Sequence, residues 1–369
     1  MKVLIAGGGT AGHVYPALAV GRRLVADHGA EVRFAGTSFG LEAQLVPAAG
    51  FPFVEVEAAP LVRRLSAGLL RFPFVMLRSV RRCRPLVEDV DVVVGMGGYA
   101  SGPAVMAAFK AGRPVVLHEQ NAVPGLANRF LSRRAAATAV SFPDAQRRFR
   151  GRSRVELTGN PIREEVAAVP PDRDRLAKEA QGELDLDPDR RTVLVFGGSQ
   201  GALHIDRAAV GACRLLRDRS DLQILLLTGR AHHAVIADAL PEREPLLVRS
   251  LPFLERMELA YASAELAVCR AGATTVAELT ACGLPSLLIP YPYATARHQE
   301  ANARSLQRAG AASVMLDDEL TAEELAERIV NLIDHRERLD AMAARARAAG
   351  RPDAAQRLAR LVMATAEGA

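Results

Sequence analysis

The first residues that could do chemistry stand in a glycine-rich stretch close to the start of the chain. The stretch GGGTAG, from Gly7 to Gly12, satisfies the spacing G-x-G-x-x-G and is followed at once by His13. The apolar run from Val3 to Ala6 predicts a strand and the run from Pro16 to Leu24 predicts a helix, so the glycines lie in the turn between them. Such a turn exposes unpaired N–H groups and the positive end of the helix dipole, which predicts an anion as its guest. An imidazole at this helix start is well placed to transfer a proton.

A nicotinamide dinucleotide is a poor candidate for this guest. A dinucleotide site carries Asp or Glu at the end of the second strand, about 20 residues after the glycines, to bind the ribose hydroxyls. Here the second predicted strand, EVRFAG, ends in Ala35 and Gly36 and is followed by Thr37, with no carboxylate. The pattern disfavours a dehydrogenase and leaves a nucleotide-sugar as the better interpretation.

Two glycine-rich turns in the second half of the chain indicate a phosphate-bearing ligand. The stretch VLVFGGSQGALH, near residue 200, again predicts a strand, a turn and a helix, and the Ser199 hydroxyl suits a phosphate. The stretch CRAGATTVAEL, from Cys269 to Leu279, predicts a second helix start of this kind. Glu278 lies in the first turns of that helix, where a carboxylate can accept two hydrogen bonds from a ribose diol. A solvated helix residue is the alternative interpretation of Glu278.

Polar side chains in two further loops could contact a sugar. His298 and Gln299, in the stretch PYPYATARHQEANA, could bind sugar hydroxyls or could simply belong to a polar loop. Glu119 and Asn121 follow the apolar run PVVLH and are predicted at the carboxyl edge of a sheet, where open α/β sheets bind ligands. We interpret His118, within the same strand, as a packing residue rather than a base.

These turns need elements that hold them, and the apolar runs predict an α/β fold with parallel sheets. Continuous runs such as VDVVVG, TVLVFGG and LQILLLTG alternate with helical stretches, which is typical of parallel strands buried on both faces. A length of 369 residues favours two domains. The repeated strand–turn–helix openings predict one domain over 1–163 and a second over 164–344, with a hinge after the stretch GNPIR.

Composition narrows the class of partner. The net charge of +5 and the isoelectric point near 9.3 favour an anionic partner, either a phosphate-bearing ligand or a membrane surface. With no Trp and 5% aromatic residues, the chain offers no stacking platform for nucleic acid. The four cysteines show no C-x-x-C spacing, and the D-x-D pair of Asp89 and Asp91 precedes a predicted strand instead of following one. No tightly bound metal is predicted.

An arginine-rich segment from Leu61 to Arg84 is a candidate for docking on anionic lipid. It contains seven arginines and no acidic residue. Arg64, Arg71 and Arg78 recur every seven residues and predict one helical face, with a break at Pro73. A surface that is both basic and apolar is what such docking requires. An ordinary solvated helix is the alternative.

The motifs form an ordered set that resembles the MurG family over nearly the whole chain: GGGTAGHVYPALAV, GGYASGP, HEQNAVPGLANR, GNPIR, GGSQGA, CRAGATTVAEL and HQEANA. The resemblance implies an inverting transferase that moves N-acetylglucosamine from UDP-N-acetylglucosamine to the 4-hydroxyl of the muramoyl sugar of lipid I, forming lipid II in peptidoglycan synthesis. It implies the GT-B fold, in which two Rossmann-like domains with parallel sheets face each other across a cleft. A C-terminal helix, about 345–369, would pack back on the first domain. The resemblance further implies no cofactor, a monomer or weak oligomer, and a peripheral place on the cytoplasmic face of the cell membrane.

The same resemblance implies roles for residues at matching positions. The loop of Thr10, Ala11, Gly12 and His13 would line the cleft, with His13 as the general base and Glu119 as the reserve candidate. The other assigned residues contact the donor: Asn121 the transferred sugar, Arg163 and Ser199 the diphosphate, Leu254 the uracil through its backbone, Ala273, Thr274 and Thr275 the nucleotide, Glu278 the ribose, and His298 and Gln299 the sugar hydroxyls. Two positions depart from the commonest family pattern, since Ala11 replaces a glycine and His298 stands where many members have Gln.

Three other functions share parts of this pattern. A UDP-N-acetylglucosamine 2-epimerase has the same fold and donor and would convert the donor without an acceptor. Another glycolipid transferase would differ in its acceptor alone. A non-catalytic nucleotide-sugar sensor would keep Glu278 and the glycine-rich turns but would not need His13.

Overall fold

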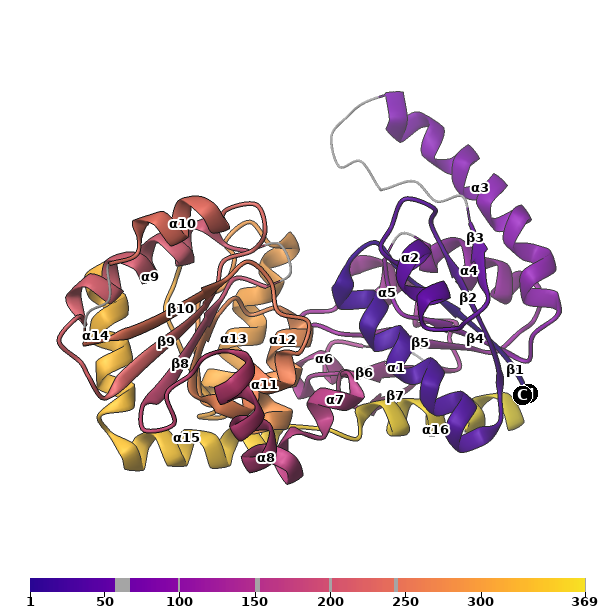
Figure 1. Ribbon diagram of the computed structural model, residues 1–369. Coiled ribbons are helices and arrows are strands. Elements are labelled where there is room, and N and C mark those ends of the chain that lie inside the picture. Colours follow the sequence, from indigo (N-terminus) through magenta and orange to yellow (C-terminus); the bar gives the residue numbers. More distant parts are fainter. Residues whose placement is uncertain (57–66, 99, 150–152, 199–200, 242–244, 369) are drawn as a thin grey trace. The chain divides into compact units, whose positions relative to one another are not determined.

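The chain forms two compact units (Figure 1). The computed structural model describes residues 1–56, 67–98, 100–149, 153–198, 201–241 and 245–368, and of residues 67–73 the backbone alone. The N-terminal unit comprises Met1–Arg163 and Asp353–Ala369, and the C-terminal unit comprises Glu164–Pro352. Each unit has its own hydrophobic core. The prediction of two α/β domains with parallel sheets is confirmed.

The N-terminal unit is a parallel sheet between layers of helices. Its described strands pair in the order β3-β2-β1-β4-β5-β6-β7. The strands are β1 (Lys2–Ala6), β2 (Glu31–Gly36), β3 (Phe53–Glu55), β4 (Val92–Gly95), β5 (Val115–Glu119), β6 (Ala137–Val140) and β7 (Arg154–Leu157). The helices are α1 (Ala11–His28), α2 (Glu42–Ala48), α3 (Ala67–Glu88), α4 (Ser101–Lys110), α5 (Leu126–Leu131), α6 (Pro143–Gln146) and α16 (Ala354–Glu367).

The core of this unit explains why its strands are continuous apolar runs. Every residue of β4 and β5 is buried, because helices cover both faces of the sheet. On one face the core includes residues of α16, which packs against α1 although it follows the whole C-terminal unit in sequence. Leu358 and Val362 of α16 are fully buried in the same cluster as Val3 and Ile5 of β1.

Helix α3 departs from one expectation. It is continuous through Pro73, where the sequence predicts a break, and it packs along α4. A proline in a helix interior removes one hydrogen bond and costs about 3 kcal/mol. The later part of α3 is anchored by Val80, Cys83 and Val87, which are buried in the core. This anchoring is the physical reason that the helix persists beyond the proline.

The C-terminal unit repeats the architecture with its own sheet. Its described strands pair in the order β10-β9-β8-β11-β12-β13, and all pairs are parallel. The strands are β8 (Arg191–Phe196), β9 (Leu222–Leu227), β10 (Leu247–Leu251), β11 (Ala264–Cys269), β12 (Ser286–Leu288) and β13 (Ala312–Val314). The helices are α7 (Glu164–Ala167), α8 (Val169–Glu183), α9 (Leu203–Leu215), α10 (His233–Ala239), α11 (Met257–Ser263), α12 (Ala273–Cys282), η1 (Thr295–Arg297), α13 (His298–Arg308), α14 (Ala322–Ile333) and α15 (Arg336–Ala349).

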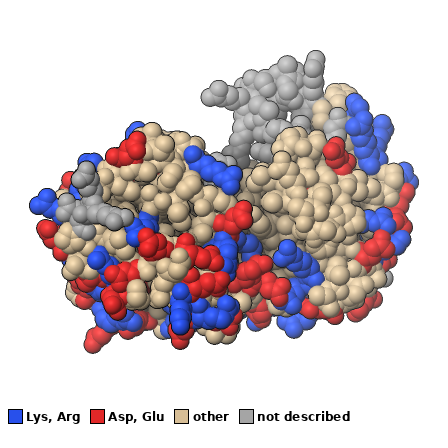
Figure 2. Space-filling view, viewed as in Figure 1, with Lys and Arg blue, Asp and Glu red and all other residues tan. Residues whose placement is uncertain are grey.

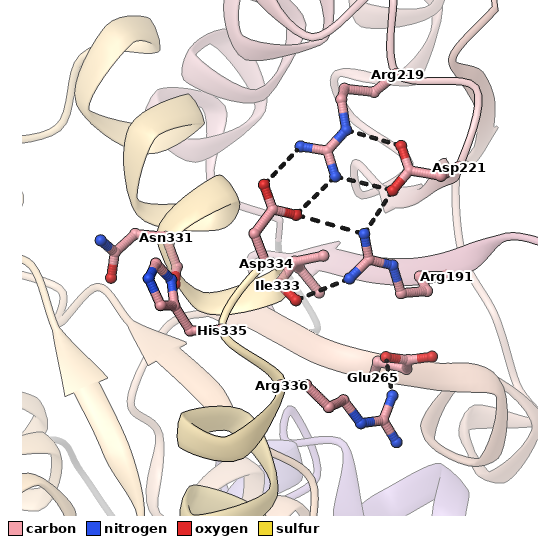
Figure 3. A network of polar contacts seen from close by, with 9 residues as sticks. All are labelled: Arg191, Arg219, Asp221, Glu265, Asn331, Ile333, Asp334, His335 and Arg336. Atoms are coloured by element: carbon pink, nitrogen blue, oxygen red, sulfur yellow. Dashed lines mark hydrogen bonds and ion pairs between the residues drawn. The ribbon is translucent and has the colours of Figure 1, made fainter.

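An ionic network fastens the amino edge of this second sheet to the end of α14 (Figure 3). Arg219 donates to both oxygens of Asp221, at 2.7 and 2.8 Å, and to both oxygens of Asp334, at 2.7 and 3.1 Å. Arg191, at the start of β8, donates to Asp221 and to the carbonyl of Ile333 at 2.8 Å. The network lies at the edge where β8 and β9 begin. Because ligands of parallel sheets bind at the opposite edge, we assign it to stability.

We expect Arg219→Ala to destabilise the C-terminal unit by about 2 kcal/mol at pH 7. Hydrogen bonds from Arg219 hold the pKa of Asp221 well below its usual value. A carboxyl group whose folded-state pKa is lowered stabilises the fold above its unfolded pKa of about 3.9, and this contribution is lost as the pH falls towards the folded-state pKa. The difference between wild type and variant should therefore shrink below about pH 4. Urea unfolding followed by circular dichroism at pH 7 and pH 3 measures this difference in the free energy of unfolding. The exposed neighbour substitution Arg217→Ala is the control and should show no such difference.

Candidate active site

Both sheets reverse their strand order at one point, and the glycine-rich turns lie beside it. In the N-terminal unit this point falls between β1 and β4, and in the C-terminal unit between β8 and β11. Residues 7–10 follow β1 and residues 96–98 follow β4, whereas residues 197–198 follow β8 and residues 270–272 follow β11. Ligands of open parallel sheets bind outside the carboxyl ends of the strands at such a switch point. Each unit therefore presents one candidate binding region.

His13 lies in the first turn of α1 and is held from two sides. Thr10 is the N-cap, but its hydroxyl bonds the ring instead of a backbone N–H, with Oγ1 3.0 Å from His13 Nδ1. The ring packs on Gly97, where φ is +89° and an added Cβ would lie 2.9 Å from His13 Cδ2. Glycine is required at this position because a side chain would displace the ring. When Nδ1–H donates to Thr10, Nε2 is the ring atom that can accept a proton.

The two histidines near this turn differ in their surroundings. Burial lowers the pKa of His13, and the charge of Glu42 raises it in part, so the ring is neutral at pH 7. His118, in β5, is almost fully buried, and its Nε2 lies 3.2 Å from the carbonyl oxygen of Gly159. Burial lowers the pKa of His118 to about 4. This is the environment of a packing histidine.

The turn before α1 does hold an anion, and the protein itself supplies it. Glu42, the first residue of α2, is 1% exposed, and its Oε2 accepts the N–H of Gly9 at 2.7 Å. Its Oε1 accepts the N–H and the hydroxyl of Thr37 at 2.9 and 2.8 Å. Burial opposes the ionisation of Glu42, but the hydrogen bonds outweigh it and hold its pKa below the usual value. The N–H of Gly9 is thus already occupied.

Glu119 organises the loop between β5 and α5. Its Oε1 accepts the N–H of Asn121 at 3.0 Å, and its Oε2 accepts the N–H of Gly125 at 3.0 Å and the side-chain amide of Asn128 at 2.9 Å. Glu119 is 3% exposed. Both carboxylate oxygens are thus engaged by donors of the same loop. The arrangement favours a role in holding Asn121 over a role as base.

In the C-terminal unit the turn after β8 is packed tightly against the end of β9. Gly201 has a φ of +74°, and an added Cβ would lie 2.5 Å from the carbonyl oxygen of Thr228. Only glycine fits so close an approach of two backbones. Ser199, the predicted diphosphate contact in this turn, lies outside the described residues.

Glu278, the predicted ribose contact, is buried in α12 and oriented by a tyrosine. The hydroxyl of Tyr261, in α11, donates to Glu278 Oε2 at 2.8 Å. Both side chains are nearly inaccessible, at 2% exposed for Tyr261 and 6% for Glu278. Burial and the neighbouring carboxylate raise the pKa of Tyr261 well above its usual value, so the phenol keeps its proton and donates it to the hydrogen bond.

Gln299 holds together the two loops that follow β11 and β12. Its side-chain oxygen accepts the N–H of Ala271 at 3.1 Å and that of Tyr291 at 3.0 Å. Asn302, one turn further along α13, donates to the carbonyl of Ala271 at 3.1 Å. The side chain of this predicted sugar contact therefore uses its oxygen within the protein. Arg270, buried between these loops, is paired with Asp317.

The remaining predicted contacts lie at the ends of elements. Ala11 and Gly12 open α1, Ala273, Thr274 and Thr275 open α12, His298 opens α13, Leu254 lies half-buried between β10 and α11, and Arg163 ends the N-terminal unit with its guanidinium 5.5 Å from the ring centre of Tyr15.

Two residues of these regions escaped the sequence analysis. Glu42, the first residue of α2, lies in a stretch of sequence that carries no motif. Tyr261 lies 17 residues before its partner Glu278, in a helix whose sequence is typical of a buried core helix. Both act on a predicted site residue rather than on a ligand.

The described part of the chain has neither a metal-binding cluster nor a membrane-spanning helix. No cluster of three or more His, Cys, Asp or Glu side chains there could hold a metal ion. Within the same part, no helix is long and apolar enough to cross a membrane.

Comparison with known proteins identifies the family. The model of the glycosyltransferase family 28 N-terminal domain matches residues 3–140, and that of the C-terminal domain matches residues 192–358. The chain is 42% identical over 377 aligned residues, covering all of both chains, to the UDP-N-acetylglucosamine–N-acetylmuramyl-(pentapeptide) pyrophosphoryl-undecaprenol N-acetylglucosamine transferase of Halothermothrix orenii. It is 38% identical to the enzyme of the same name from Bacillus subtilis, with 97% of this chain and 98% of the relative covered.

Solved structures agree with this placement. The crystal structure of Acinetobacter baumannii MurG is similar with a TM-score of 0.80 and 30% identity, covering 98% of this chain and 99% of that one. A UDP-N-acetylglucosamine 2-epimerase from Neisseria meningitidis is similar with a TM-score of 0.70 but only 14% identity over the whole of both chains. The second likeness concerns the fold alone.

Proposed function

The chain belongs to the MurG family within glycosyltransferase family 28, and from this membership we infer that it transfers N-acetylglucosamine from UDP-N-acetylglucosamine to lipid I. The product is lipid II, the disaccharide intermediate of peptidoglycan synthesis. The observation that carries this conclusion is the full-length match, at 42% identity, to a relative named for that transfer. The epimerase alternative is supported only by a likeness of fold.

The reaction inverts the anomeric centre. The 4-hydroxyl oxygen of the acceptor bonds to the anomeric carbon from the face opposite UDP, and the anomeric C–O bond breaks with its electron pair leaving on UDP. The hydroxyl proton passes to Nε2 of His13, the step for which a positioned base typically gains about 10²–10⁴-fold in rate. The N–H groups at the start of α12 would stabilise the charge of the departing diphosphate.

The roles of the individual residues divide between the two units. In the N-terminal unit, His13 acts on the acceptor, and its neutral ring and its hydrogen bond from Nδ1 to Thr10 support this role. In the C-terminal unit, Glu278 binds the ribose hydroxyls and Gln299 a hydroxyl of the transferred sugar. The fixed orientation of Glu278 and Gln299 supports these roles, since each side chain is held by hydrogen bonds within the protein.

A transfer assay tests the function directly. UDP-N-acetylglucosamine labelled in the sugar is incubated with the protein, with and without a short-chain lipid I analogue. We expect label in the lipid fraction only when the analogue is present. Conversion of the labelled donor that is equally fast without the analogue would instead indicate an epimerase or a hydrolase. Tight binding of the donor with no turnover would indicate a different acceptor or a sensor.

We further propose that the outer face of α3 docks the enzyme on the anionic surface of the cytoplasmic membrane, where its lipid acceptor resides. Phe74 is 75% exposed and Leu77 is 41% exposed, unlike the buried Val80 and Cys83 on the opposite face of the helix. Exposed arginines follow along the same helix: Arg78, Arg81, Arg82 and Arg84. Figure 2 shows Lys and Arg side chains along the edge of the N-terminal unit where Figure 1 places α3. The earlier part of the arginine-rich segment, residues 61–66, lies outside the described residues.

The double substitution Phe74→Ser and Leu77→Ser should weaken binding to anionic vesicles about tenfold or more, since both side chains would lose burial in the lipid interface. Co-sedimentation with vesicles of phosphatidylglycerol and phosphatidylcholine in equal parts measures this binding. Leu215→Ser, which changes a leucine of α9 that is 55% exposed, is the matched control and should bind as wild type does. Equal binding by wild type and the double variant would contradict docking through α3. Wild-type binding that does not depend on vesicle charge would contradict it as well.

A further inference from the structure

One buried carboxylate ties the turn before α1 to the loop before α2. Glu42 accepts hydrogen bonds from the N–H of Gly9 and from both donors of Thr37. Hydrogen bonds to an ionised acceptor are about twice as strong as those between neutral groups. The two loops follow neighbouring strands, β1 and β2, and are thus joined through a single anion.

The space around this carboxylate is kept open by glycines. An added Cβ would lie 2.2 Å from Glu42 Cδ if placed on Gly8, 2.4 Å from Cγ if placed on Gly36, and 2.1 Å from Oε2 if placed on Gly40. A residue that only filled this space could be apolar. An apolar residue would leave the N–H groups of Gly9 and Thr37 without their acceptor, which costs about 1–3 kcal/mol for each buried group. The surroundings therefore require a carboxylate.

The anion lies next to the predicted base. Gly9 directly precedes Thr10, whose hydroxyl holds the His13 ring, so fixing Gly9 fixes the start of α1 and the direction of the ring. The charge of Glu42 also acts on His13 and raises its pKa against the effect of burial. His118 also interacts electrostatically with His13, and it is neutral at pH 7 because its pKa is about 4.

We propose that Glu42 is a positioning residue for the transfer: it holds His13 in place through Gly9 and Thr10, and its charge stabilises the imidazolium that forms. The inference rests on the proposed function, in which His13 is the base. The proton moves from the acceptor hydroxyl to His13 Nε2 and then to water, and Glu42 stays ionised throughout. Its task is that of the carboxylate that supports the histidine of a hydrolase triad, carried out through the backbone of a turn instead of a bond to the ring.

Two variants separate the charge of Glu42 from its position. Glu42→Gln keeps the shape and removes the charge, whereas Gly40→Ala keeps the charge and displaces the carboxylate. We expect both to lower kcat about tenfold or more, with the KM for UDP-N-acetylglucosamine changed less than about twofold. Gly182→Ala in α8, where an added Cβ would meet nothing within 4 Å, is the matched control and should leave kcat and KM unchanged.

A second measurement does not depend on turnover. The titration of His13 is followed by NMR with labelled histidine, and its signal is identified by comparison with His13→Gln. We expect the pKa of His13 to fall in Glu42→Gln, because the charge that raises it is removed. If the Glu42→Gln protein does not fold, Gly40→Ala should show the same downward shift.

The outcomes distinguish the two proposals. Wild-type protein that transfers no sugar to lipid I would refute the proposed function, while the titration would still test the coupling of Glu42 to His13. Active wild type together with unchanged kcat and unchanged His13 titration in both variants would overturn the inference. An equal loss in kcat and in donor affinity would show that the role of Glu42 is structural. This result would overturn the inference as well.

Discussion

Replacing His13 with alanine is expected to lower kcat by about 10²–10⁴-fold while the affinity for UDP-N-acetylglucosamine changes less than about threefold. The reason is that a general base acts on the acceptor hydroxyl only as the bond forms, so its loss affects the transition state and not the bound donor. Steady-state transfer to a lipid I analogue gives kcat, and calorimetric titration with the donor gives the affinity. His28→Ala, at the exposed end of the same helix, is the matched control and should retain full activity.

The pH dependence of kcat provides a second check on His13. Burial holds its pKa below the usual value of 6.5, so the proton-accepting form is present at neutral pH. The rate should therefore be level near pH 7 and fall at acidic pH, where the ring gains its proton. In His13→Ala this acidic limb should disappear from the residual activity. A parallel loss of donor affinity and kcat would show that His13 binds substrate instead of accepting a proton.

The second large effect is expected at Glu278. Glu278→Gln should raise the dissociation constant for UDP-N-acetylglucosamine about 10–100-fold, because a hydrogen bond to a charged acceptor contributes about 1.5–3 kcal/mol. Tyr261→Phe should have a smaller effect in the same direction, since it removes only the bond that orients the carboxylate. Glu327→Gln, on the exposed side of α14, is the control for a lost carboxylate and should bind the donor normally.

A donor analogue tests whether Glu278 contacts the ribose. A 2′-deoxyribose form of the donor should bind wild type more weakly, and the two donors should bind Glu278→Gln almost equally. The four binding measurements form a thermodynamic cycle, in which the carboxylate of Glu278 and the ribose hydroxyl are removed singly and together. The cycle therefore isolates the interaction energy between the two groups. If the deoxy form loses the same affinity in both proteins, Glu278 does not bind that hydroxyl.

The sequence was sufficient to predict the architecture because its strands are buried on both faces. The run of β4 is apolar throughout and that of β9 is apolar except for Gln223, and their lengths and turns indicate parallel strands joined by helices. The glycine-rich turns could be placed at the carboxyl ends of strands for the same reason. Both inferences need only local information.

What could not be predicted depends on contacts between distant parts of the chain. Glu42 lies 33 residues from Gly9, and only the pairing of β1 with β2 brings them together. The sequence contains no carboxylate at the end of β2. It gave no indication that a carboxylate further along the chain would accept the N–H of Gly9. Likewise, side-chain oxygen atoms of Glu119 and Gln299 accept hydrogen bonds from the protein itself. Residue type alone does not show whether such a side chain holds a loop or binds a ligand.

The packing of α16 has a consequence for synthesis on the ribosome. The core around Val3 and Ile5 is finished only by Leu358 and Val362, which are translated after the whole C-terminal unit. At a rate of about 5–20 residues per second, the first unit waits about 10–40 s for this helix. During that interval the apolar surface that α16 covers is open to chaperones. A nascent chain that stops before residue 354 is therefore expected to be degraded, because it would carry a folded C-terminal unit beside an unfinished N-terminal one.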